Sequence, residues 1–234
     1  PLTGTPVPAG ARYEVVGKSP LTGTWGNANS GGDFGPNLKF AGYDAIFFTG
    51  ISEKSIYLFI EDGVAEIRDA GHLWGKDTFE TEAMLKSELG EETRVACIGP
   101  AGEKLSLISA IITNRGHAAA RSGLGAVMGS KKLKAVAVIG TAEVPLADKR
   151  SVRELRREQI DELSKNEPTN RLRKFGTPGG TTIGLYLGRF KVKNLSGVAS
   201  KDFPDVAPIS GESFLNLTER REGCYRCPIS CHAR

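Results

Sequence analysis

Three of the four cysteines in this 234-residue chain lie within eight positions, at Cys224, Cys227 and Cys231. Two residues separate the first pair and three separate the second, so a tight turn can point three thiolates at one centre. An iron–sulfur cubane, which takes four cysteine ligands, accepts runs of this kind. Zinc is the second candidate, because it also accepts three cysteines and a histidine, and His232 follows the last cysteine. A disulfide or free thiols remain the third, although the odd number of clustered cysteines disfavours pairing.

The length, the net charge and the distribution of apolar residues and cysteines limit the class of protein to which the chain can belong. Its length suffices for one large domain, or for a domain and part of another. The net charge of +4, from 31 basic and 27 acidic residues, is too small and dispersed to indicate a nucleic-acid surface. We find no apolar run of about 18 residues and no charged-then-apolar leader. Because the few cysteines are clustered rather than paired along the chain, we expect a cytoplasmic protein without membrane or nucleic-acid partners.

Apolar patterning predicts a strand-rich first part. A helix over residues 77–89 is indicated by a capping box between Asp77 and Glu80 and by Gly90 at its end. Cys97 falls inside a short apolar run, so we expect it in the core and not as a ligand. Strands are expected at 12–16, 45–49, 55–60, 64–67, 94–98 and 134–139, with a further strand or buried helix start at 105–112.

The composition and the periodicity of the sequence change near residue 146. Ser151 with Glu154 predicts a second capping box, followed by a helix with one apolar stripe and a charged outer face. Beyond Glu167 the chain is rich in proline, glycine and threonine and shows few periodic signals. We therefore expect an α+β protein, with a strand-rich domain over 1–146 and the start of a mainly helical domain over 147–234.

Glycine is over-represented, with 29 residues against a usual share of about 7%. Many of these glycines fall in two segments, 26–32 and 116–129, which we predict to be loops with exposed main-chain amides. Successive amides bind anions, and Arg12 and Arg121 lie near the two segments in sequence. The pattern favours a large polar cofactor with phosphate groups, and close packing on small residues is the alternative. The dinucleotide fingerprint does not fit, since its third glycine comes one residue late.

Six short segments, taken in order, closely resemble the tungsten-containing aldehyde:ferredoxin oxidoreductase family. Each is weak alone, but their joint order is hard to obtain otherwise. The cysteine run at 224–231 resembles the cluster motif of that family, so the match covers nearly all 234 residues. The six segments are Lys18–Gly23, Asn29–Gly32, Leu38–Asp44, Ile98–Glu103, Arg121–Lys131 and Leu133–Ala135.

The resemblance implies twisted β-sheets on which a tungsten (or molybdenum) bis-pterin cofactor sits, followed by helical domains that carry a [4Fe-4S] cluster. It also implies that the domain over 1–146 lacks its N-terminal part. His117 stands where many members have arginine, and Ala120 where many have glycine. The positions that correspond to cofactor contacts are Arg12, Asn29, Gly31, His117, Ala118, Ala120 and Arg121, and those that correspond to cluster ligands are Cys224, Cys227 and Cys231.

The resemblance further implies an activity, the oxidation of aldehydes to carboxylic acids with ferredoxin as electron acceptor. From the same resemblance we expect a bound magnesium ion and assembly as a homodimer. No segment here matches the acid/base glutamate and histidine of the family, so we expect no catalytic residue in this chain, and a fourth cluster ligand outside it. The alternative hypothesis is a zinc-stabilised Cys₃His binding module without redox activity, in which the glycine segments serve packing alone.

Overall fold

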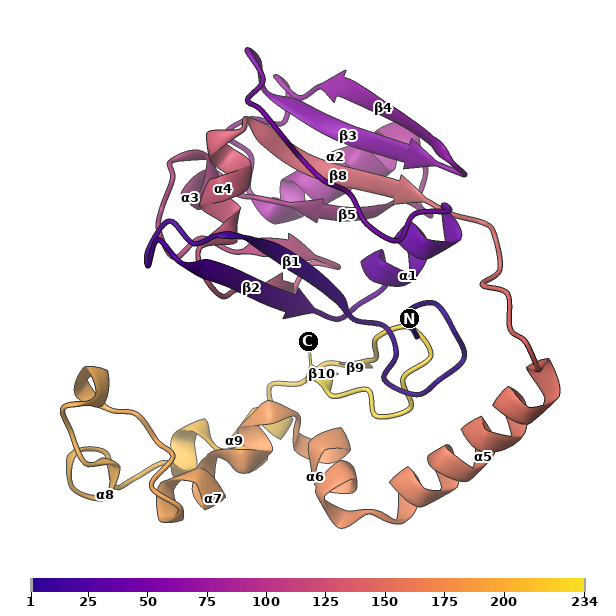
Figure 1. The fold of residues 1–234 in the computed structure, drawn as a ribbon. Coiled ribbons are helices and arrows are strands. Elements are labelled where there is room, and N and C mark those ends of the chain that lie inside the picture. Colours follow the sequence, from indigo (N-terminus) through magenta and orange to yellow (C-terminus); the bar gives the residue numbers. More distant parts are fainter. Residues whose placement is uncertain (1, 234) are drawn as a thin grey trace. The chain divides into compact units, whose positions relative to one another are not determined.

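The computed structural model describes residues 2–233 and confirms the α+β class (Figure 1). The chain divides into two compact units. The first contains the residues up to Pro6 and Gly10–Ala147, and the second contains Val7–Ala9 and the residues from Asp148 onward. The first unit carries the sheets, whereas the second consists of helices, short turns and one small strand pair.

A six-stranded mixed sheet forms the centre of the first unit, with the strand order β4-β3-β8-β5-β6-β7. β3 and β8 run parallel, and every other neighbouring pair in this sheet is antiparallel. The strands expected at 55–60 and 64–67 form a hairpin, in which β3 and β4 are joined by a turn at Asp62 and Gly63. The strands are β3 (Ile56–Glu61), β4 (Val64–Asp69), β5 (Arg94–Cys97), β6 (Ile111–Thr113), β7 (His117–Ala119) and β8 (Leu133–Ile139).

All seven residues of β8 are buried, because the sheet is covered on both faces. A continuous apolar run is the sequence pattern that such a strand requires. Val136 and Val138 belong to the core on one face, and Ala135 and Ala137 belong to the core on the other. Cys97 lies in the second of these cores with 1% of its surface exposed, as the sequence predicted.

Helices and a strand ribbon cover the two faces (Figure 1). Helix α2 (Thr78–Leu89) packs on one face through Leu85, and its predicted capping box between Asp77 and Glu80 is present. The other face is covered by α1 (Phe34–Phe40), α4 (Leu124–Ser130) and the two-stranded ribbon of β1 (Tyr13–Lys18) and β2 (Trp25–Ser30). Short helix α3 (Pro100–Glu103) lies against α4.

The expectation of a loop over residues 26–32 is wrong for most of that segment. Residues up to Ser30 form strand β2, which pairs antiparallel with β1. Gly26, Ala28 and Ser30 are buried, while the residues between them are exposed, so the segment does alternate with period two. Small and polar residues concealed this alternation, because a hydrophobicity pattern does not register glycine, alanine and serine as a buried face.

Three other predictions also fail in part. Residues 45–49 form no strand, since no neighbouring segment of the described chain pairs with them, and Phe47 is 90% exposed. Only Ile111–Thr113 of the apolar run at 105–112 enters the sheet. The helix expected after residue 150 begins earlier, because the side chain of Asp148, not that of Ser151, accepts the free amides at its start.

The second unit contains more helix than its sequence indicated. After α5 (Lys149–Lys165), which has no buried residue, the chain forms α6 (Glu167–Phe175), capped by Asn166. Shorter helices follow at α7 (Thr181–Tyr186), α8 (Ala199–Asp202) and α9 (Gly211–Leu215), and strands β9 (Arg221–Glu222) and β10 (His232–Ala233) pair antiparallel. Within residues 2–233, no helix is both long and apolar enough to cross a membrane.

A buried ion pair interrupts the apolar character of β8. Lys134 is fully buried, and its Nζ donates to Glu103 Oε1 at 2.5 Å and to the Lys76 carbonyl at 2.7 Å. The Glu103 carboxylate also accepts the Gly75 N–H, at 3.0 and 2.9 Å. A buried charge of this kind is tolerated only because its partners satisfy it.

Replacing Lys134 by methionine should destabilise the protein by about 3–5 kcal/mol, because Glu103 is then left buried without a counter-charge. The double variant Lys134→Met/Glu103→Leu should recover most of this loss. Urea unfolding followed by circular dichroism measures both. As a control, Lys104→Met changes an exposed lysine next to Glu103 and should shift stability by less than about 0.5 kcal/mol. Equal stability of the Lys134→Met variant and the natural protein would contradict this account.

Cys97 should be chemically silent in the folded protein. Burial raises the pKa of its thiol to about 12, so the reactive thiolate is scarce at pH 8. Iodoacetamide at pH 8 should therefore modify Cys97 only after unfolding in urea, as peptide mass spectrometry can determine. Modification of Cys97 in the native protein at the rate of a free thiol would show that it is not in a closed core.

Candidate functional site

The two glycine-rich segments lie against each other in the first unit, although about 90 residues separate them in sequence. Gly26 faces Ser122, where an added Cβ would lie 2.7 Å from the Ser122 Cβ. Ser122 Oγ also donates to the Asn27 carbonyl at 3.4 Å. The segments can approach this closely because one of them presents glycine at the point of contact.

A second contact joins the segments at Gly32. This glycine has φ +85°, and an added Cβ would lie 2.4 Å from Asn114 Oδ1 and 3.2 Å from His117 Cδ2. Both the backbone conformation and the lack of space therefore require glycine here. Gly31, its buried neighbour, thus lies one residue from the contact with His117. The structure brings these two predicted site residues into one neighbourhood.

Arg12 and Asn29 form the first half of the candidate site. Arg12 Nε donates to Asn29 Oδ1 at 2.8 Å, and Arg12 Nη2 donates to the Asn29 carbonyl at 3.3 Å. Asn29 is fixed by its place in β2, where it lies opposite Glu14. Both side chains are exposed, so the guanidinium is oriented by Asn29 and still open to a ligand.

His117, Ala118, Ala120 and Arg121 form the second half. His117 and Ala118 are half-buried in edge strand β7, where Ala118 pairs with Ile112. Ala120 and Arg121 follow the strand and are exposed. Beyond them the chain turns sharply, since Gly123 has φ +65° and its added Cβ would lie 2.0 Å from the Leu107 carbonyl oxygen. Arg121 therefore stands between a strand end and a glycine-dependent turn.

Asn114 is a residue of this site that sequence reasoning missed. Its Oδ1 accepts the Asp33 N–H at 3.0 Å, which ties the β6–β7 turn to the end of the first glycine segment. The backbone of Asn114 has φ +48°, a conformation that asparagine tolerates better than most residues. The turn sequence Asn-Arg-Gly at 114–116 was a usable signal for the turn, but nothing in it indicated a partner 81 residues away.

The residues present fit a large anionic group. Two exposed guanidinium groups, Arg12 and Arg121, supply forks that match phosphate oxygens. Gly26 and Gly32 let the two segments pack directly against each other, since a side chain at either position would clash with Ser122 or Asn114. The prediction of a nest of free amides needs correction, however, because the ladder between β1 and β2 engages backbone groups of residues 25–30.

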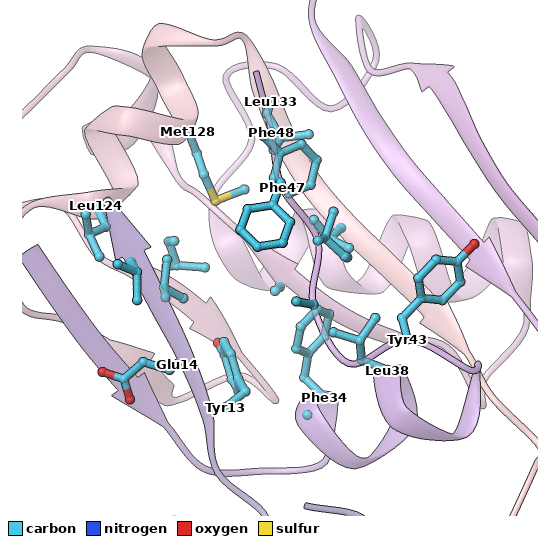
Figure 2. A pocket seen from close by; sticks show the side chains of 18 of the residues that line it. Tyr13, Glu14, Phe34, Leu38, Tyr43, Phe47, Phe48, Leu124, Met128 and Leu133 are labelled. Atoms are coloured by element: carbon cyan, nitrogen blue, oxygen red, sulfur yellow. The ribbon is translucent and has the colours of Figure 1, made fainter. Parts of the chain in front are cut away.

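A cavity of about 670 Å³ lies beside β1 in the first unit, and it is mainly apolar, although Arg12 and Lys131 are among the residues that line it. Figure 2 shows Tyr13, Phe34, Phe47 and Met128 around this space. Burial raises the pKa of Tyr13 to about 12, so its hydroxyl stays protonated at neutral pH. Most of this lining suits apolar groups, but Arg12 belongs both to the cavity wall and to the candidate site, so the cavity adjoins that site.

The three clustered cysteines lie between β9 and β10 of the second unit, in residues 223–231, which we call the cysteine loop. None of the three forms a disulfide among the described residues, and all three are half-buried. The N–H of Cys227 donates to the Cys224 carbonyl at 2.9 Å, which forms the predicted tight turn. Across residues 2–233, no three His, Cys, Asp or Glu side chains converge on a metal-sized centre.

The cysteine loop fits a thiolate-ligated centre by its chemistry. Three cysteines outside any disulfide, on one short segment, supply sulfur donors of the kind that an iron–sulfur or zinc site uses. In this arrangement the side chains do not meet at one point, so binding requires them to turn inward. His232 is the fourth ligand of the zinc hypothesis, and its backbone is held in β10 opposite Glu222.

Both parts of the chain match known protein families. Residues 1–140 match the family described as "Aldehyde ferredoxin oxidoreductase, N-terminal domain". Residues 154–234 match "Aldehyde ferredoxin oxidoreductase, domains 2 & 3".

Individual relatives agree with this result. The tungsten-containing aldehyde ferredoxin oxidoreductases of Pyrococcus furiosus and Thermococcus kodakarensis are each 48% identical over 99% of the chain. The aliphatic sulfonate oxidoreductase, WOR-like subunit, of Pyrococcus furiosus is 34% identical, also over 99% of the chain. The chain spans 38% of the length of each of these relatives.

A solved structure with a similar fold is the active site complex BamBC of benzoyl coenzyme A reductase with 1,5-dienoyl-CoA. It superimposes with a TM-score of 0.83 at 33% identity, covering 98% of this chain and 37% of that one. Family matches to both parts of the chain, close relatives and a shared fold lead to one conclusion. The chain belongs to the aldehyde ferredoxin oxidoreductase family of oxidoreductases.

Proposed function

We propose that this chain forms the surface that binds the cofactor, which we call the cofactor bed, and supplies three cluster ligands of a tungsten-containing enzyme. That enzyme oxidises aldehydes to carboxylic acids. The observation that carries the proposal is the contact of the two glycine-rich segments at Gly32, Asn114 and His117. It supports the proposal because it joins the segment that carries Asn29 and Gly31, with Arg12 bonded to Asn29, to the segment that carries His117, Ala118, Ala120 and Arg121. Those are the positions that correspond to cofactor contacts in the family.

In this proposal the residues of the bed bind and orient a bis-pterin group of tungsten or molybdenum. When bound, that group supplies two-electron redox chemistry, and the protein supplies position and electrostatics. Arg12, held by Asn29, and Arg121 bind phosphate oxygens through their guanidinium forks. His117 places less positive charge at the phosphates than arginine would, and Ala120 leaves the backbone less open than glycine would. A magnesium ion at the phosphates completes the proposed cofactor set.

The cysteine loop serves in this proposal as the electron exit. Cys224, Cys227 and Cys231 hold three irons of a [4Fe-4S] cluster, and a fourth thiolate comes from outside these residues. Ferredoxin accepts the electrons one at a time. Since such clusters require reduced cysteines, we place the protein in the cytoplasm, and a homodimer is part of the same proposal.

Aldehydes are the substrate class favoured by the relatives. Four tungsten-containing aldehyde ferredoxin oxidoreductases are 44–48% identical to the chain. The relative named for aliphatic sulfonates and the structure named for benzoyl coenzyme A are 34% and 33% identical. The acid/base groups of the reaction are not assigned to residues of this chain.

Replacing Arg121 by alanine in the full-length enzyme should lower its tungsten and pterin content about tenfold, because a phosphate contact is lost. Metal analysis by mass spectrometry and pterin fluorescence after oxidation measure both. Arg157→Ala, which removes an exposed arginine from α5, is the matched control and should retain the cofactor. Unchanged tungsten and pterin in the Arg121→Ala enzyme would refute the assigned contact.

Replacing Cys227 by serine should abolish the brown absorption that dithionite bleaches, because the cluster loses a thiolate. Cys97→Ala removes the cysteine outside the loop and should leave this absorption intact. Iron and zinc analysis of the natural protein decides between the two metal hypotheses. Zinc without iron, tungsten or molybdenum would reject the proposed function and support the Cys₃His binding module.

A further inference from the structure

Two arginines hold the cysteine loop and its surroundings in the second unit. Arg173, near the end of α6, donates from Nη2 to the Pro228 carbonyl at 2.7 Å. Arg221, at the start of β9, donates from Nη2 to the Lys174 carbonyl at 2.6 Å. Each side chain thus bridges the end of α6 and the C-terminal strands through one of its terminal nitrogens.

The other terminal nitrogen of Arg221, Nη1, does not form a bridging hydrogen bond of this kind within the described part of the chain. Nη1 is buried, and among residues 2–233 it has no hydrogen-bond partner. An arginine is always charged and presents its donors in a fixed fork, so a buried and unused N–H is costly. Buried polar groups nearly always have a partner, so this nitrogen calls for an acceptor outside the described residues.

The position of Nη1 indicates where that acceptor lies. A Cβ added to Gly176 would be 3.0 Å from Arg221 Nη1 and 2.9 Å from the Cys231 carbonyl oxygen. The unused donor and the backbone of Cys231 therefore flank the same point. Gly176 leaves this point open, and its φ of +67° disfavours any other residue there.

We propose that Arg221 donates through Nη1 to the iron–sulfur centre of the cysteine loop and thereby raises its reduction potential. The inference rests on the proposed function, since it requires a cluster at Cys224, Cys227 and Cys231. Thiolate ligands make such a cluster anionic, and one-electron reduction adds a further negative charge. A hydrogen bond and a positive charge beside its sulfur atoms stabilise the reduced form more than the oxidised form.

The test is a redox titration of the full-length enzyme, followed by electron paramagnetic resonance of the reduced cluster. Arg221→Met, which removes both the donor and the charge, should lower the midpoint potential. Arg221→Gln keeps a neutral donor and should give a smaller shift in the same direction. Arg221→Lys keeps the charge and should restore most of the potential, which a purely structural role for the side chain would not predict.

Arg157→Gln is the control, because it removes the charge of an exposed arginine on α5. It should leave the midpoint potential unchanged. A cluster with the same potential in the natural, Arg221→Gln and Arg221→Met enzymes would overturn the inference while leaving the proposed function standing. If Arg221→Met fails to assemble its cluster, the ordering of the glutamine and lysine variants decides. Absence of a cluster from the natural enzyme would reject the proposed function and this inference together.

Discussion

The burial of strand β8 on both faces is the constraint on which the first unit depends. A strand covered on two sides needs apolar residues at consecutive positions, and Leu133–Ile139 supplies them except at Lys134. That lysine is tolerated because Glu103 and the Lys76 carbonyl satisfy its ammonium group. The ion pair thereby attaches α3 and the segment before α2 to the middle of the sheet, so one residue of β8 fixes parts of the surrounding layer.

The candidate cofactor bed lies at the margins of this rigid sheet. β7 is an edge strand, and the β1–β2 ribbon is separate from the six-stranded sheet. Side chains at a margin can face a ligand from solvent, whereas all seven residues of β8 are buried. Two features then join the margins, the glycine contacts at Gly26 and Gly32 and the bond from the Asp33 N–H to Asn114. The site is thus built by close backbone approach instead of by long side chains.

Sequence reasoning succeeded where the signal was local and periodic. The β3–β4 hairpin, β8 and the capped helix α2 follow from apolar patterns and capping residues within a few positions. It failed at β2, because Gly26, Ala28 and Ser30 form a buried face without hydrophobic bulk. It failed at residues 45–49 for the opposite reason, since strand-forming residues need a partner that the described chain does not supply.

The candidate sites show the same division between local signals, which could be predicted, and contacts between distant residues, which could not. The spacing of the cysteines predicted a turn, and the Cys227-to-Cys224 hydrogen bond is present. Family resemblance supplied the positions from Arg12 to Arg121, and the fold shows that two of them, Arg12 and Asn29, are bonded directly. Asn114 and Arg221 could not be predicted, because their importance lies in one hydrogen bond to a distant backbone and in one unsatisfied nitrogen. Such properties exist only after folding.

The parallel pairing of β3 with β8 has a consequence for how the chain folds. Ile56 lies beside Leu133, so more than 70 residues must be synthesised before the two strands can meet. The β3–β4 hairpin closes locally and can form early, but its inner edge stays unpaired until β8 leaves the ribosome. Contacts of high sequence separation slow folding and leave strand edges exposed to other chains. The same strand that organises the native core is therefore the last of the six strands to be synthesised, and the interval before it arrives is when this domain is most prone to aggregate.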